Sequence, residues 1–138
     1  LARTAAQRRA EAPDVAPLAA AIGRMERAAV AFAAARDAAL GAPRAPSPAA
    51  LRATNEALKQ VERALTRPEG LRTRPWFRGL IYAADEDNGY ATVVFPSIAE
   101  ALRDRDASRA RVEVADLAGR FDAATRRLEE ATRAIGAR

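Results

Sequence analysis

The spacing of apolar residues predicts long amphipathic helices over most of the chain. From about Asp14 to Leu40, apolar side chains recur at alternating steps of four and three, which places them on one helix face. Another such segment begins around Asp106 or Ser108 and keeps this rhythm nearly to the C-terminus. A shorter polar element is expected at residues 1–12. The apolar positions are Leu18, Ile22, Met25, Ala29 and Phe32 in the first long segment and Val114, Leu117, Phe121, Ala124, Leu128, Ala131 and Ile135 in the last.

A further helix is expected between these two, after the proline-rich stretch "APRAPSPAA". Ser47 followed by Pro48 favours a helix start, because a serine oxygen can accept a hydrogen bond from the first turn and proline suits the first helical position. The helix is expected to end before Pro68 and Gly70. Its inward positions are Leu51, Leu58, Val61 and Leu65.

The composition indicates how these helices combine. The 138 residues suffice for one hydrophobic core, and aromatic residues make up only 5% of the chain, so the core must consist mostly of Ala, Leu, Val and Ile. Small side chains at this density favour close helix packing over a sheet. We therefore expect one all-α domain over residues 1–138, a four-helix bundle with an irregular aromatic insert at residues 71–102 between the third and last helices.

The chain contains neither His nor Cys, which excludes Ser-His-Asp and Cys-His catalysis and removes the usual zinc ligands. We therefore expect no catalytic residue, metal site or cofactor within this chain. The acidic run 85–87 is interpreted as a solvated turn, because it lacks the spaced oxygen ligands of a calcium loop. No apolar run is long enough to span a membrane.

The net charge of +5 fits a function of another class, a stand-alone basic helical module that binds nucleic acid. The order of the charges argues against this alternative. Arginines are interleaved with acidic residues, as in "RDRDASRARVEVAD", whereas a phosphate-binding surface gathers its cations. We therefore expect no nucleic-acid partner.

The insert concentrates the rarer residues, with the only Trp, both Tyr and two of the four Phe. Within it, Asn88 and Gly89 lie between "LIYA" and "YATVVF", a pattern typical of a tight turn between two short extended runs. From the residues alone, we expect a small hairpin or irregular lobe that caps one end of the bundle.

The run "RPWFR" in the insert has two interpretations. Arg74, Trp76, Phe77 and Arg78 could dock on a neighbouring domain and reach its acidic groups. Alternatively, Trp76 and Phe77 anchor the insert to the bundle, while the two arginines bond backbone carbonyls.

The alanine-rich helix expected at residues 14–40 is small and uncharged on more than one face. A helix that is apolar most of the way round is usually buried on two sides. One side would face this bundle and the other a partner, most often a second copy of the same chain. The alternative is that the alanines reflect only coding bias and helix propensity.

From Asn55 onward, the sequence resembles the C-terminal helical domain of the glutamate carboxypeptidase II and transferrin receptor family. The shared pattern is N-x-x-L, E-R-A, P-x-G-L, R-P-aromatic-aromatic-R, I-Y-A, N-x-Y-A and F-P-x-I-x-x-A-L, in this order. The resemblance covers about the last 85 residues well and the first 50 loosely. The residues that carry it are Asn55, Leu58, Glu62, Arg63, Ala64, Pro68, Gly70, Leu71, Arg74, Pro75, Trp76, Phe77, Arg78, Ile81, Tyr82, Ala83, Asn88, Tyr90, Ala91, Phe95, Pro96, Ile98, Ala101 and Leu102.

This resemblance implies a non-enzymatic homodimerisation domain that follows a zinc peptidase domain in a longer protein. The zinc would then belong to the peptidase domain, and the partners would be that domain and a second copy of the chain. The start "LARTAAQRRAEAP" fits this expectation, because it has neither an initiator Met nor a signal peptide. The resemblance also allows a non-catalytic, receptor-like parent, and a secreted or periplasmic location.

The resemblance further implies that the 86–96 loop contributes to the substrate cleft of the parent. Tyr90 stands at the position of the family's substrate-sensing tyrosine, and Asn88 and Gly89 form the turn before it. The family has a lysine where this chain has Gly89, and a histidine where it has Gly79. A charge-assisted contact is therefore missing here.

Overall fold

The computed structural model describes residues 12–137 of the chain. It contains the helices α2 (Ala16–Leu40), α3 (Pro48–Ala64), α4 (Pro96–Arg103) and α5 (Ala107–Gly136), with the strands β1 (Tyr82–Ala84) and β2 (Thr92–Val94) between α3 and α4. The polar element expected at residues 1–12 lies outside the described residues, apart from Ala12.

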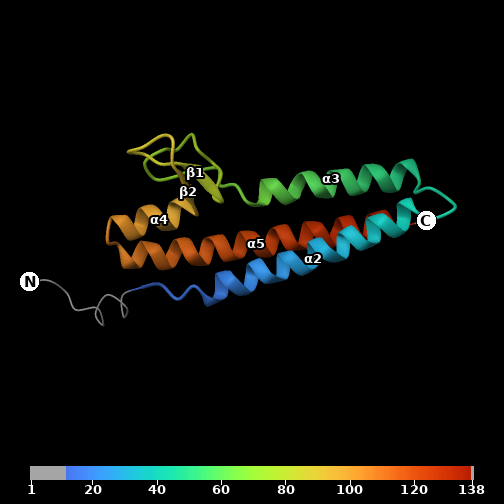
Figure 1. The fold of residues 1–138 in the computed structure, drawn as a ribbon, viewed down its shortest axis with the longest axis horizontal. Helices are drawn as coiled ribbons and strands as arrows, with labels where there is room; N and C mark the ends of the chain where they lie inside the picture. The colour runs from blue at the N-terminus through green and yellow to red at the C-terminus, as the bar shows by residue number, and fades with distance from the viewer. Residues whose placement is uncertain (1–11, 138) are drawn as a thin grey trace, which may run out of the picture.

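The long helix α5 forms the centre of the fold. It packs along both α2 and α3, and α4 folds back onto its first turns, whereas α2 and α3 make few contacts with each other. In Figure 1, α2 and α5 run in the same direction and α3 runs in the opposite one. The expected all-α fold is thus confirmed, and the helices form an open bundle around α5. The three expected long helices are α2, α3 and α5, and the fourth described helix, α4, lies in the segment that was expected to be irregular.

The helix ends follow the local chemistry of the chain. Ser47 caps α3 as expected, since its side-chain oxygen accepts a hydrogen bond of 3.2 Å from the N–H of Ala50, and Pro48 is the first helical residue. Asp106 caps α5 in the same way, with 2.9 Å between its Oδ1 and the N–H of Arg109. The seven apolar positions expected to face inward from α5 are all buried.

Two inward positions expected from the periodicity are wrong. Ala29 of α2 is exposed, and Leu51 of α3 is 40% exposed. The buried residues of α3 are instead Ala50 and Thr54. Both helices have α5 as their main neighbour, and α5 covers only a narrow stripe of each. Because a helix turns by about 100° per residue, apolar residues at the edge of the expected stripe point away from α5 and stay exposed.

The insert has more regular structure than expected. β1 and β2 pair antiparallel with Tyr82 opposite Val94, and the segment expected to be irregular after β2 forms α4. The loop between the strands has seven residues, 85–91, in place of a tight Asn88-Gly89 turn. Because Gly89 does not take the left-handed conformation, the chain does not form the turn that this dipeptide favours.

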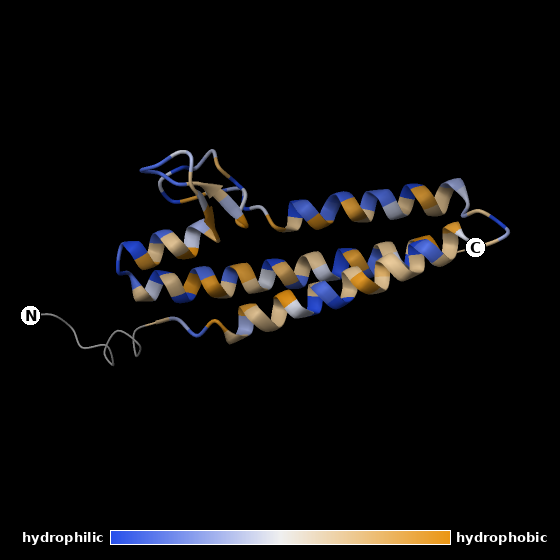
Figure 2. Ribbon diagram, viewed as in Figure 1, coloured by the Kyte–Doolittle hydropathy of each residue, from blue (hydrophilic) through white to orange (hydrophobic). Residues whose placement is uncertain are grey.

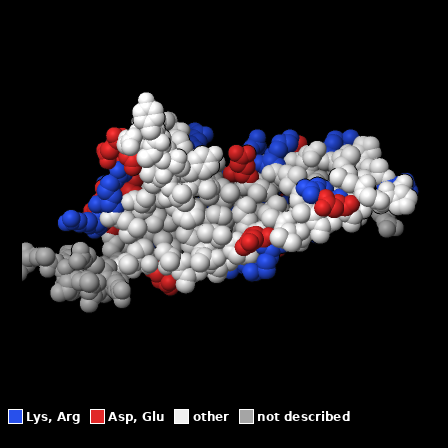
Figure 3. All heavy atoms as spheres, in the orientation of Figure 1, with Lys and Arg blue, Asp and Glu red and all other residues white. Residues whose placement is uncertain are grey.

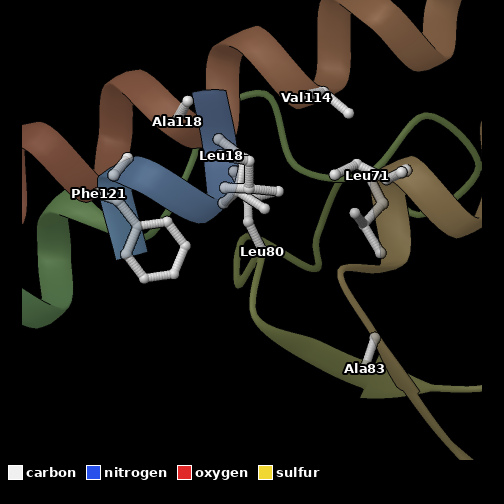
Figure 4. Close-up of a cluster of buried hydrophobic side chains, with 10 residues drawn as sticks. Leu18, Leu71, Leu80, Ala83, Val114, Ala118 and Phe121 are labelled. Atoms are coloured by element: carbon white, nitrogen blue, oxygen red, sulfur yellow. The ribbon is translucent and has the colours of Figure 1, made fainter. Parts of the chain in front are cut away.

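The base of the insert belongs to the main hydrophobic core. Leu71 and Leu80 are fully buried and pack with Leu18 of α2 and Phe121 of α5, as Figure 4 shows. In Figure 2, hydrophobic ribbon segments of the insert point down toward the helices, and its outer loops are hydrophilic. Residues 71–95, called the lobe from here on, therefore continue the core and present a separate outer surface.

Candidate functional site

The loop at residues 85–91, at the tip of the lobe, is shaped by its own side chains. Asp85 Oδ1 accepts hydrogen bonds of 2.9 Å from the N–H groups of Asn88 and Asp87, and these two bonds lower the pKa of the Asp85 carboxyl. The side chain of Asn88 in turn accepts a bond of 3.2 Å from the N–H of Tyr90. The loop thereby holds Tyr90 with its ring fully exposed to solvent.

The acidic residues of this loop are bound to α4. Arg103 donates one hydrogen bond of 3.0 Å to Glu86 and another of 3.2 Å to Asp87, and Thr73 also donates to Glu86. These contacts connect the loop to a helix that packs on α5. Within residues 12–137, no group of three or more acidic side chains lies close enough together to hold a metal ion.

Arg74 lies inside the lobe. One of its nitrogens donates to Glu100 of α4 at 2.8 Å and another to the carbonyl of Ala84 at 2.6 Å, while its guanidinium lies 5.9 Å from the ring centre of Phe77. The side chain of Glu100 is only 5% exposed, so this ion pair is almost completely shielded from water. Arg74 therefore joins the end of β1 to α4.

The four residues of the expected docking run divide into two pairs. Arg74 and Phe77 point inward, where Phe77 is partly buried against the core. Trp76 is 77% exposed and Arg78 is exposed as well. The anchoring interpretation thus describes Phe77 and the carbonyl contact of Arg74, but not Trp76.

Sequence reasoning missed two further exposed residues of the lobe. Tyr82 and Val94 are direct cross-strand partners, so their side chains lie on the same side of the hairpin, and both are exposed. The alternation around Ala83, which is buried, could have indicated this outward side. Figure 3 shows uncharged side chains at the tip of the lobe, and charged ones along one flank.

The connection before the lobe is fixed to α5 by a second arginine. Arg67 donates to Glu113 at 2.8 Å and to the carbonyl of Gly70 at 3.1 Å. Burial lowers the pKa of its guanidinium, but the hydrogen bond and charge of Glu113, with the charge of Asp116, raise that pKa above its ordinary value overall. The lobe is therefore held to the helices at both of its ends.

The outer surface of the lobe carries exposed groups that are suited to contact with another surface. The exposed groups include two phenols, an indole, a valine and two arginines, and the chain has no His or Cys. A phenol can donate a hydrogen bond to a carboxylate, and an exposed indole can bury its ring against another surface. None of the helices in the described part of the chain is apolar enough over a sufficient length to cross a membrane.

Comparisons with known proteins agree with this architecture. The family model of the transferrin receptor-like dimerisation domain matches residues 13–129. The chain is 38% identical over 52 residues to "Probable glutamate carboxypeptidase LAMP1" of Arabidopsis thaliana, a match that covers 38% of this chain and 8% of the relative. It is 41% identical over 51 residues to "Probable glutamate carboxypeptidase VP8" of Zea mays, which covers 37% of this chain and 7% of the relative. The matches thus span less than a tenth of either relative. Because the family model covers most of the chain, the protein belongs to the family of transferrin receptor-like dimerisation domains.

Proposed function

We propose that this chain is the homodimerisation scaffold of a glutamate carboxypeptidase-like zinc peptidase. Its family is that of a dimerisation domain, and the two relatives above bear the name of glutamate carboxypeptidases. The chain has no His or Cys, so the zinc and the catalytic residues would lie in a peptidase domain outside it. The chain itself would then act by holding other polypeptide surfaces in place.

The observation that supports a role for the lobe is its combination of a fixed base and exposed aromatic rings. Arg74 and Arg103 hold the loop at residues 85–91 to α4, while Tyr90 is fully exposed. Because the loop is held in this way, a ligand contact through Tyr90 does not require the loop itself to become ordered, which limits the loss of conformational entropy. We propose that Tyr90, with Asn88 and Gly89 before it, forms one wall of the parent's substrate cleft.

The same arrangement supports docking on the peptidase domain. Trp76 and Arg78 provide an exposed ring and an exposed cation on the outer surface of the lobe, and Arg74 and Phe77 support that surface from inside. Nucleic acid is not part of this proposal, because many arginines pair with acidic residues, as Arg24 does with Asp122. A receptor-like, non-catalytic parent remains the alternative within the same family.

The cleft proposal predicts a defined effect of Tyr90→Phe in the complete polypeptide that the gene encodes. Loss of the hydroxyl should raise the KM for peptides that end in glutamate by about 10- to 100-fold, because a hydrogen bond to a charged group contributes about 1.5–3 kcal/mol. Steady-state hydrolysis of such peptides measures this effect.

Tyr82→Phe is the matched control, because it removes a hydroxyl from the other exposed tyrosine of the hairpin. An equal KM for wild type and Tyr90→Phe would contradict the cleft role. If the complete gene encoded no peptidase domain, the proposal of a peptidase parent would be refuted. If the complete polypeptide did not hydrolyse these peptides, the receptor-like alternative would be favoured.

The scaffold proposal also predicts self-association. Light scattering on the 138-residue chain should give twice the 14.7 kDa mass of one copy at micromolar concentration. A mass of one copy that persisted at millimolar concentration would contradict a self-sufficient interface in this chain.

A further inference from the structure

One side of α2 is not covered by any element in the described part of the chain. α2 packs on α5 alone among the helices, and Figure 1 shows it along the edge of the molecule. On its uncovered side, Val30 is 67% exposed, and most of the other residues there are alanine or glycine. We call this side the outer face of α2. It consists of Ala16, Ala19, Gly23, Glu26, Arg27, Val30 and Ala34.

The charges of the outer face are few and adjacent. Glu26 and Arg27 are exposed near the middle of α2, and neither forms an ion pair with another residue in the described part of the chain. Asp37, near one end of the helix, already pairs with Arg36, and Arg24 pairs with Asp122 of α5. Among residues 12–137, one acid and one base without an ion-pair partner therefore follow each other in the sequence near the middle of a mostly uncharged surface.

We infer that two copies of this chain pair through the outer faces of their α2 helices, which run antiparallel about a two-fold axis level with Glu26 and Arg27. The inference rests on the proposed homodimer and specifies the surface that forms it. In a two-fold contact of antiparallel helices, residues equally far from the axis face each other. Glu26 then faces the second copy's Arg27, and the same pair forms again on the other side of the axis.

This placement of the axis also matches the shapes of the apolar residues. Gly23 lies opposite Val30 of the second copy. The exposed side chain of Val30 packs against Gly23 when the guanidinium of Arg27, which lies over Gly23 in the single copy, turns toward the second copy's Glu26. Ala19 lies opposite Ala34, which brings two small residues together and permits a close approach of the helix axes. With charge and shape matched at the same axis position, the outer face of α2 is complementary to itself.

The central charges also select this geometry over others. In a parallel arrangement of the two helices, Glu26 would face Glu26 and Arg27 would face Arg27, and like charges that face each other across an interface are unfavourable. The isolated copy does not need a glycine at position 23. A Cβ on Gly23 would lie 3.5 Å from Nη1 of Arg27, which is an ordinary contact. A larger side chain there should therefore weaken pairing without straining the single copy.

Charge reversal and charge exchange in the 138-residue chain test the inference. Glu26→Arg and Arg27→Glu should each raise the dimer dissociation constant at least about 10-fold, because each places like charges opposite each other twice. The double variant Glu26→Arg with Arg27→Glu restores opposite charges and should return to within about 3-fold of wild type. Gly23→Leu should weaken the dimer on its own. Sedimentation equilibrium measures the constants, and circular dichroism checks that each variant is folded.

The chain contains a matched control on another helix. Glu62 and Arg63 of α3 form the same dipeptide and are both exposed. The same single reversals there should leave the dissociation constant unchanged.

The outcomes separate this inference from the proposed function. If the wild-type chain dimerised but the single reversals on α2 left the dissociation constant unchanged, or the double variant did not restore it, the α2 surface would be wrong. The proposed homodimer would not be affected by that result. If the wild-type chain stayed monomeric, both the α2 surface and the homodimer would be overturned for this chain.

Discussion

Replacement of Gly70 by alanine is expected to destabilise the chain by on the order of 3 kcal/mol or more. Gly70 has φ +68°, a left-handed conformation in which a Cβ is unfavourable, and an added Cβ would lie 2.2 Å from the carbonyl oxygen of Pro75. The atoms in the way belong to the backbone of Pro75 and Phe77, so a change of rotamer cannot relieve the overlap. Urea unfolding followed by circular dichroism measures the loss.

The loss should extend beyond the lobe. The residue after Gly70 is Leu71, which is fully buried, and its N–H bonds the carbonyl of Phe77 at 3.0 Å. A displaced Gly70 would therefore pull Leu71 out of the core that it shares with α2 and α5.

Gly89→Ala is the matched control for this prediction. Gly89 does not have a positive φ, and a Cβ added there would meet no atom within 4 Å. Its effect on the free energy of unfolding should stay within about 0.5 kcal/mol. Equal stability of the two alanine variants would contradict the close approach of Gly70 to Pro75.

The second large effect is expected for Arg74→Ala, with a loss of about 3–5 kcal/mol in the free energy of unfolding. Its side chain is 15% exposed, and within residues 12–137 it is the ion-pair partner of the buried carboxylate of Glu100. Truncation would leave this carboxylate shielded from water without a counter-charge, and the carbonyl of Ala84 would lose a hydrogen bond. Chemical unfolding at neutral pH measures the loss.

Two further variants show whether the buried charge causes this effect. Arg74→Met combined with Glu100→Leu removes both charges and keeps apolar volume, so it should recover most of the stability that Arg74→Ala loses. Arg78→Ala, which truncates the exposed arginine of the same run, should change the free energy of unfolding by no more than about 0.5 kcal/mol. If Arg74→Ala were as mild as Arg78→Ala, the ion pair with Glu100 would not stabilise the lobe.

These two positions connect the core to the proposed site. Gly70 fixes the start of the lobe, and Arg74 joins the end of β1 to α4, from which Arg103 holds the loop that carries Tyr90. A change at either position should therefore disturb the outer surface of the lobe as well as its stability. This is why the test of the cleft proposal uses Tyr90→Phe, a change on the exposed surface.

Much of the candidate site could be located from the sequence, but not its internal order. The aromatic residues and the Asn88-Gly89 dipeptide indicated a small hairpin or irregular lobe. The structure forms the hairpin, but with a seven-residue loop that contains Tyr90 in place of the tight turn. The division of "RPWFR" into an inward and an outward pair was not predictable, because it depends on Glu100, 26 residues further along the chain. The ion pairs of Arg103 with the loop were missed for the same reason, and helix α4 itself was expected to be irregular.

The sequence by itself determined the features that depend on neighbouring residues. The long helices, the cap at Ser47 and the buried stripe of α5 follow from hydrogen bonds and periodicities within a few residues, so they could be derived before any contact was known. Only the tertiary structure decided which side of each helix is covered. It left Leu51 and the outer face of α2 exposed and buried Leu71, Leu80 and Glu100 inside or beneath the lobe. Burial of a side chain depends on which distant segments pack against it, and the spacing of residues along the chain does not contain that information.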